Sequence, residues 1–281
     1  MKIDTLLLSA CGSKGICYVG VFDCLQKYKV ITNNLQNIKR IISCSAGSIF
    51  GFLLLLHYDL SFCTLLITKL DFEKVLFNMN EIDESLFSNH GLFTNKKISH
   101  LIELLLQNKY NVSDITLLEL YNRTNIEFIV KTYNITKLEV EYISYKNHPN
   151  LSIKLLILMT TCIPIIFKPI LYNGSYYIDG GVTGNLPYID KYNNYLGIYI
   201  KSTNSNNDIM KLSIFKYISR IIHNISEEYT FPIEDKKIIK IIVDIPPLGF
   251  NVDQILKVNC IDNAYQRTKD HLLKYNLIKS I

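Results

Sequence analysis

Two short turns in the sequence carry side chains suited to nucleophilic catalysis. The first is SCSAG at residues 43–47, where Ser45 occupies the centre of a pattern close to the G-x-S-x-G of a nucleophile elbow. In such an elbow the serine follows a strand and precedes a helix, and small neighbours let the two elements pack closely. The positive end of the helix dipole then favours an attacking oxygen. A serine that only caps a helix would give a similar pattern.

The second turn offers a base for this serine. Asp179 follows an apolar run at residues 176–178 and precedes Gly180 and Gly181. A carboxylate that is held by a glycine turn and partly removed from water is oriented and becomes a more effective base. An ordinary Asx-turn at the end of a strand is the alternative interpretation of these residues.

Histidine, the usual partner of a catalytic serine, has no comparable setting in this chain. The six histidines lie among polar or helical residues, with no glycine turn to place them: His57, His90, His100, His148, His223 and His271. An α/β-hydrolase that uses His223 or His271 is an alternative, but that fold requires an intact G-x-S-x-G. We therefore expect a carboxylate, and not an imidazole, beside Ser45.

A third turn, ACGSKG at residues 10–15, supplies backbone groups instead of side chains. Glycines that open a helix leave N–H groups able to hold a phosphate or an oxyanion. The turn is an incomplete dinucleotide-binding fingerprint, because the second strand ends in Ser43 where an acidic residue is needed. No Walker pattern is present in the sequence. An oxyanion hole is the interpretation that is left.

The elements around these turns predict an α/β fold. The first sixty residues predict a buried strand at 5–9, a helix at 16–28, a strand at 38–42 and a hydrophobic helix directly after the Ser45 turn. This order is typical of a parallel sheet with crossover helices. Further elements are predicted at 60–109 (helical), 126–133 and 139–144 (strands), 152–161 (helix), 195–200 (strand), 211–226 (helix), 240–245 (strand) and 253–275 (helix). Without a repeat or a linker, residues 1–281 are predicted to form one domain.

Composition excludes several classes of function. Of 281 residues, 48% are hydrophobic and 20% charged, which is typical of a globular chain and not of a disordered one. The net charge of +5 is spread along the chain, so we expect no nucleic-acid partner. The seven cysteines include no CxxC pair, which argues against a zinc site or a disulfide framework and favours the reducing cytoplasm. No apolar run is long enough for a secretory signal or a membrane span.

Together these motifs resemble those of the patatin-like phospholipase family. The similarity rests on GSKG at 12–15, SCSAG at 43–47, TTCIPIIFKP at 160–169 and YIDGGVTGNLP at 177–187, in the order and spacing of that family. It extends from about residue 5 to at least residue 200. The last two segments are the most specific.

The resemblance implies a three-layer α/β/α fold with a mostly parallel central sheet, and hydrolysis of acyl esters of phospholipids or related lipids without a metal or cofactor. By position in the motifs, Ser45 is the implied nucleophile and Asp179 the base of a Ser–Asp dyad. The N–H groups around Gly12 and Ser13 would form the oxyanion hole. Lys14 matches a basic position that could meet a lipid phosphate.

A lipid substrate also implies peripheral contact with a membrane surface. Lipid head group, chain length and oligomeric state have no signal in the sequence.

The chain departs from the family pattern at three residues. Ala10 and Cys11 stand where the first turn usually begins with glycines, and Ser43 replaces the first glycine of the elbow. All three are small, so close packing is expected to survive. A positive φ at Cys11 would store about 1–3 kcal/mol of strain. These changes leave open a second hypothesis, a catalytically silent protein of patatin fold that binds a lipid or a partner.

Overall fold

The computed structural model describes residues 3–69, 90–190, 192–203, 217, 236–245 and 253–279. Apart from Tyr217, the helix predicted at 211–226 lies outside the described residues, as does His223. The part of the predicted helical stretch at 70–89 also lies outside them.

The first two strand–helix units form as the sequence predicts. β1 (Thr5–Leu8) leads into the 3-10 helix η1 (Gly12–Ile16) and α1 (Cys17–Lys27), and β2 (Arg40–Cys44) leads into α2 (Ala46–Leu55). β1 and β2 pair in parallel. Their side chains are almost all buried, as expected for strands in the middle of a covered sheet. Because both strands run in the same direction, their turns emerge at the same edge of the sheet.

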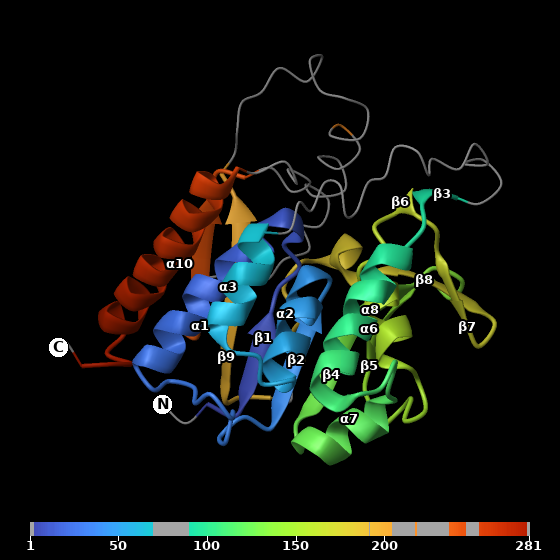
Figure 1. Cartoon of the computed structure of the whole chain (residues 1–281), viewed down its shortest axis with the longest axis horizontal. Helices are drawn as coiled ribbons and strands as arrows, with labels where there is room; N and C mark the ends of the chain where they lie inside the picture. The colour runs from blue at the N-terminus through green and yellow to red at the C-terminus, as the bar shows by residue number, and fades with distance from the viewer. Residues whose placement is uncertain are drawn as a thin grey trace.

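The central sheet is mixed but mostly parallel (Figure 1). Its strand order is β10–β9–β1–β2–β4–β8–β7, and β5 also pairs with β4. The strands from β10 to β4 are parallel to their neighbours, whereas β5, β8 and β7 add antiparallel pairs. The further strands are β4 (Glu127–Asn134), β5 (Glu139–Ile143), β7 (Ile170–Tyr172), β8 (Ser175–Asp179), β9 (Tyr195–Ser202) and β10 (Ile238–Val243).

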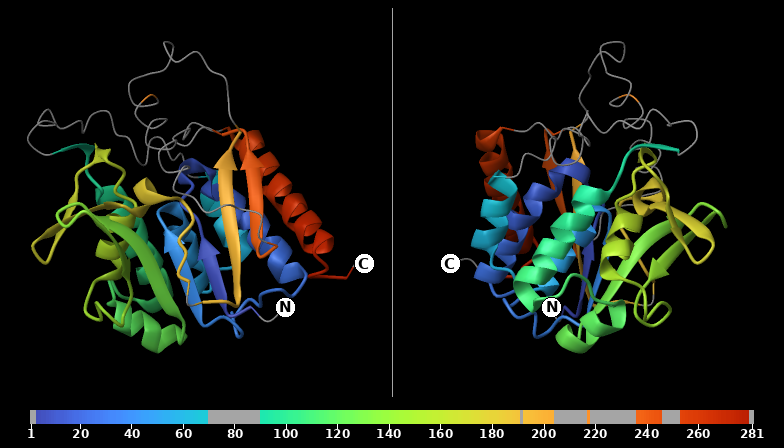
Figure 2. Two further views of the ribbon diagram at one scale, coloured as in Figure 1. Left: turned by 180° about the vertical axis from the view of Figure 1, so that it is seen from behind. Right: turned by 45° about the vertical axis from the view of Figure 1, so that its right-hand side comes forward.

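The core lies on both faces of this sheet, so the predicted three-layer α/β architecture is confirmed. On one face a large cluster packs the strands against helices, which Figure 1 shows in front of the sheet: α1, α2, α3 (Leu60–Lys69), α6 (Lys96–Tyr110), α8 (Ile153–Thr160) and α10 (Gln254–Lys274). The left view of Figure 2 shows the molecule from behind, and there the segment that follows Asp179 lies on the back face of the sheet. There a smaller cluster joins Leu7, Ile42 and Ile129 to Leu186 and Tyr188.

The strand register brings two distant turns together. Val130 and Lys131 of β4 pair with both β2 and β5, so these two strands lie on opposite edges of β4. The next residues of β4 pair with both β5 and β8, so β8 shares an edge of β4 with β2. β2 ends with Cys44 opposite Lys131, and the antiparallel β8 ends with Asp179 opposite Thr132. The ends of β2 and β8 therefore meet on one edge of β4.

Three features of the fold differ from the sequence prediction or were missed by it. The predicted helical stretch at 60–109 contains α3, α6 and the short strand β3 (Gly91–Phe93), which pairs in parallel with β6 (Ile165–Phe167). Strands of three residues are too short for a hydrophobic period to be recognised. The helix α7 (Leu117–Thr124) was also missed, although Thr116 and Glu119 form a capping box before it.

Candidate active site

Ser45 lies in a strained turn between β2 and α2. Its backbone has φ 52° and ψ −128°, a conformation that costs a residue other than glycine about 1–3 kcal/mol. Gly47 permits the turn, since a Cβ at this position would lie 2.6 Å from the carbonyl oxygens of both Leu8 and Ser9. Ser43 is fully buried in β2, so this small side chain is accommodated in place of the elbow's first glycine.

The Ser45 hydroxyl contacts the Asp179 carboxylate directly. Ser45 Oγ donates a hydrogen bond of 2.5 Å to Asp179 Oδ2, and the Gly181 N–H donates one of 2.7 Å to Asp179 Oδ1. The Asp179 N–H donates to the Cys162 carbonyl at 2.9 Å, which fixes the end of β8. Both oxygens of the carboxylate are therefore held, and one of them faces the serine.

Burial changes the acid–base character of this pair. Asp179 is only 5% exposed and Ser45 6%. Burial raises the pKa of Asp179 to about 6, while the hydrogen bonds from Ser45 and Gly181 and the charge of Lys131 limit the rise. A carboxylate whose pKa lies near neutrality can both accept a proton and return it at physiological pH. This is the property that a general base without histidine requires.

Two residues whose roles were not predicted from the sequence hold the serine in place. The Ser45 N–H donates to Thr160 Oγ1 at 2.9 Å, and Thr160 Oγ1 donates to the Lys131 carbonyl at 2.7 Å. The sequence does contain a signal for Lys131, because it lies inside the apolar run FIVKT of β4 and buried lysines are rare. Thr160 begins the segment TTCIPIIFKP that carries the family resemblance, but the segment gave no role for this residue, because that role depends on where the end of α8 lies relative to β2.

The first turn adopts its shape without strain at Cys11. Cys11 has φ −153°, and the left-handed conformation falls on Gly12, with φ 56°, where a glycine costs little. The first hydrogen bond of η1 runs from the Lys14 N–H to the Cys11 carbonyl, so the helix itself does not use the N–H groups of Gly12 and Ser13. Gly12 and Ser13 line the same pocket as Ser45.

Lys14 points away from this pocket. Its side chain is 1% exposed, and its ammonium donates to Ser202 Oγ at 3.2 Å near the end of β9. Ser202 Oγ in turn donates to the Ile245 carbonyl at 2.7 Å. The structure does not bring Lys14 together with the other predicted site residues, and contact with a lipid phosphate stays a prediction that this placement does not favour.

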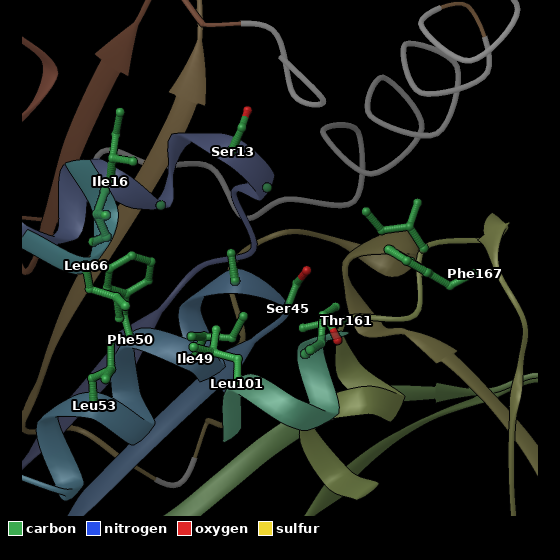
Figure 3. Close-up of a pocket in the computed structure, with 16 residues that line it drawn as sticks. Ser13, Ile16, Ser45, Ile49, Phe50, Leu53, Leu66, Leu101, Thr161 and Phe167 are labelled. Carbon is green, nitrogen blue, oxygen red and sulfur yellow. The ribbon is translucent and has the colours of Figure 1, made fainter. Parts of the chain in front are cut away.

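An apolar pocket extends from Ser45 along α2 (Figure 3). Its walls are almost entirely hydrocarbon and come from η1, α2, α3, α6 and the segment after α8, including Ile49, Phe50, Leu53, Leu101, Ile163 and Phe167. Figure 3 shows Ser45 between Phe167, on one side of this set, and Leu53, on the other. Leu53 follows Ser45 by eight residues, which corresponds to about 12 Å along a helix. The pocket lining therefore follows about two turns of α2, and its chemistry suits a hydrocarbon chain.

The predicted alternative with an imidazole base has no support at Ser45, whose hydroxyl donates to a carboxylate. His271 Nε2 lies 2.9 Å from the Lys236 carbonyl oxygen. Over the residues that the structure describes, no group of three or more His, Cys, Asp or Glu side chains is arranged to hold a metal ion. Within the same residues no helix is both long and apolar enough to cross a bilayer.

A sequence profile described as patatin-like phospholipase matches residues 6–190. The chain belongs to the patatin-like phospholipase family. The matched region contains η1, the Ser45 turn and Asp179, and it ends before β9. The family expected from the motifs is thus confirmed. The α/β-hydrolase alternative is not supported.

Two viral proteins are similar in sequence to this family member. The chain is 32% identical over 185 residues to "Probable lipid hydrolase 463L" of Invertebrate iridescent virus 6, a match that covers 65% of this chain and 61% of the relative. It is 25% identical over 294 residues to "Uncharacterized protein R571" of Acanthamoeba polyphaga mimivirus, covering 97% and 95% of the two chains. The chain therefore spans less than two thirds of the iridescent virus protein and almost all of the mimivirus one.

Solved structures with the same fold include two bacterial proteins. VipD from Legionella pneumophila superposes with a TM-score of 0.65 at 18% identity, over 98% of this chain and 67% of VipD. ExoU, in its complex with SpcU from the type III secretion system of Pseudomonas aeruginosa, gives a TM-score of 0.55 at 13% identity, over 98% of this chain and 52% of ExoU. At these identities the similarity concerns the fold alone, and this patatin-like chain spans about half of the ExoU chain.

Proposed function

We propose that this protein is a lipid acyl hydrolase of the phospholipase A type, with Ser45 as nucleophile and Asp179 as general base. The observation that carries the proposal is the hydrogen bond to Asp179 Oδ2 from Ser45 Oγ, a residue that lines an apolar pocket. Family membership and the viral relative named as a probable lipid hydrolase support the reaction class.

In the first half of the proposed reaction, Ser45 Oγ attacks the ester carbonyl carbon of the lipid while its proton passes to Asp179 Oδ2. The carbonyl oxygen becomes an oxyanion, which the N–H groups of Gly12 and Ser13 stabilise. As the tetrahedral intermediate collapses, the C–O bond to the alcohol breaks and Asp179 returns the proton to the leaving oxygen. The acyl group is then bound to Ser45, and a lysophospholipid or another alcohol leaves.

In the second half, water attacks the acyl-enzyme and Asp179 accepts the proton of this water. The second tetrahedral intermediate releases a fatty acid, and the proton returns to Ser45 Oγ. A base with a pKa of about 6 suits both halves, because it must be ionised before each attack and protonated before each collapse.

The apolar pocket would hold the acyl chain, because hydrocarbon walls offer nothing to a charged head group. The head group would then remain outside, toward a membrane surface. We therefore propose a phospholipid or another acyl lipid as substrate, peripheral contact with the membrane, and a cytoplasmic protein that acts as a single domain. Lys14 is not assigned a part in substrate binding.

Two measurements on the purified protein test this function. Incubation with mixed phospholipid liposomes, followed by mass spectrometry of the lipids, is expected to detect free fatty acid and lysophospholipid. A fluorophosphonate probe, which reacts with activated serines, is expected to label Ser45 in the wild type and to leave Ser45→Ala unlabelled. A protein that binds liposomes but neither releases fatty acid nor reacts with the probe would support the silent lipid-binding hypothesis instead.

A further inference from the structure

Lys131 is a buried cation at the point where the two halves of the candidate dyad meet. It is 4% exposed in the middle of the central sheet. In the register of β4 it pairs with Cys44, the residue before Ser45, and its neighbour Thr132 pairs with Asp179. Burying an ammonium is costly unless its N–H groups are hydrogen-bonded. The contacts of Lys131 must therefore offset the cost of burying its ammonium.

The main-chain carbonyl of Lys131 supports the serine side of the pair. It accepts a hydrogen bond of 2.7 Å from Thr160 Oγ1, which itself accepts the Ser45 N–H at 2.9 Å. The same carbonyl packs against the turn of the acid, since a Cβ on Gly180 would lie 2.5 Å from its oxygen. The β4 backbone at Lys131 is therefore in contact with both turns.

The side chain of Lys131 supports the acid side. Its ammonium donates to the Thr183 carbonyl at 3.1 Å and to the Gly184 carbonyl at 2.7 Å. These carbonyls close η3 (Gly180–Thr183), the short helix that begins directly after Asp179. The helix in turn presents the Gly181 N–H to Asp179 Oδ1. The ammonium thus fixes the segment that orients the carboxylate.

We propose that Lys131 is a positioning residue for the dyad: its ammonium holds η3 against the sheet and supplies the buried positive charge that keeps Asp179 ionised before each attack. This inference rests on the proposed function, because it assigns Lys131 to the base of that reaction. The motifs that mark the family in this sequence do not include position 131.

The other ionisable groups around Asp179 cannot replace this charge. They are thiols: Cys44 at the end of β2, Cys11 before η1 and Cys162 after α8. Burial raises the pKa of Cys11 and of Cys162 to about 12 and that of Cys44 well above its usual value, so all three are neutral at physiological pH. The charge of Lys131 lowers the pKa of Asp179 and thereby opposes the larger effect of burial, which raises it.

The opposing effects of burial and of the Lys131 charge give the direction in which the pKa of Asp179 should change when the charge is removed. Without the ammonium the Asp179 carboxylate is less stable relative to its protonated form, so the pKa of Asp179 rises. An opposite charge nearby shifts a carboxyl pKa by about one unit or more. The pH at which the enzyme reaches half of its maximal rate should therefore move upward from about 6.

The test compares Lys131→Gln, which keeps N–H donors but not the charge, with Lys131→Met, which keeps neither. The fluorophosphonate labelling rate of Ser45 and kcat/KM for a soluble ester are measured from pH 5 to pH 9. In both variants we expect the pH of half-maximal rate to rise by about one unit. At pH 6 the rate of each variant, as a fraction of its own plateau rate, should then be about fivefold lower than that of the wild type. Lys131→Met should also lose plateau rate, because η3 is no longer held.

Lys146→Met is the matched control. This substitution removes a positive charge from beside Glu127, which lies at the end of β4 away from Asp179. It should leave the pH of half-maximal rate unchanged. If both Lys131 variants lose rate equally at all pH values, Lys131 has only a structural role and the inference is overturned. A wild type that shows neither labelling nor hydrolysis would instead defeat the proposed function. Should Lys131→Met fail to fold, the half-maximal pH of Lys131→Gln decides the question.

Discussion

Ser45 Oγ and Asp179 Oδ2 lie 2.5 Å apart although 134 positions separate the two residues in the chain. Their contact follows from the register of a single strand, because β2 and β8 end on the same edge of β4. β2 is parallel to β4 and β8 is antiparallel to it, so the ends of β2 and β8 approach each other from opposite directions. The pair needs no third residue to bridge it.

The rate should depend on pH through the ionisation of Asp179. Because burial raises the pKa of this carboxyl to about 6, and because only the ionised form accepts the Ser45 proton, kcat/KM should rise with pH and be half-maximal near pH 6. Hydrolysis of a soluble ester measured from pH 4 to pH 8 checks this. A rate that is unchanged between pH 5 and pH 7 would exclude a buried carboxylate as the base.

The same pKa has a consequence for stability. The pKa of Asp179 is higher in the folded state than in the unfolded state, so the folded protein binds this proton more tightly. The resulting stability is fully present below about pH 4 and is lost as the pH rises through about 6. The free energy of unfolding falls by about 3 kcal/mol in total. Asp179→Asn removes this loss. Thermal unfolding should therefore show the variant to be more stable than the wild type at pH 8, with a smaller difference at pH 4. An equal difference at both pH values would contradict the raised pKa.

Thr160 should act through the position of Ser45. Thr160→Val leaves the Ser45 N–H and the Lys131 carbonyl without their shared partner, which is expected to cost about 1–3 kcal/mol of folding free energy. We expect kcat to fall at least about tenfold, and Thr160→Ser to restore most of it. Thr268→Val is the control, because Thr268 is also a buried helical threonine whose hydroxyl donates to the Ala264 carbonyl. A kcat that falls equally in the control would show that general destabilisation is the cause.

Leu53 should limit the length of the acyl chain. Leu53→Phe adds bulk to the pocket wall about two turns along α2 from Ser45, so kcat/KM for long-chain esters should fall about tenfold relative to short-chain esters. Leu25→Phe adds the same bulk at a buried position outside the pocket lining and should leave the ratio of the two substrates unchanged. If Leu53→Phe lowers both substrates equally, the acyl chain does not lie along α2.

Much of the site could be predicted because its turns demand particular residues. Gly47 is required by the close approach of Leu8 and Ser9, and Gly12 by its positive φ, so both leave a mark in the sequence. The turn of Gly47 marks Ser45 as a candidate, and the turn of Gly180 and Gly181 marks Asp179. The strands and helices that carry them were predicted for the same reason, since their apolar runs are bounded by small residues.

The supporting residues could not be predicted in the same way. Thr160 and Lys131 contribute through contacts between α8, β4 and the elbow, and such contacts depend on the register of strands far apart in the chain. The direction of the Lys14 side chain likewise depends on β9 and Ser202. Neither β3 nor β6 could be recognised, because a strand of three residues stabilised by its partner has no period of its own.

The proposed role of Asp179 as the base for Ser45 is best tested by replacing its carboxylate with an amide. The rate of hydrolysis by purified Asp179→Asn is measured against wild type on the same ester at pH 8, with Ser45→Ala as the reference for complete loss. We expect Asp179→Asn to be folded and at least about 10⁴-fold slower than the wild type, close to Ser45→Ala, because an amide cannot accept the serine proton. Turnover by folded Asp179→Asn at the wild-type rate would contradict this role.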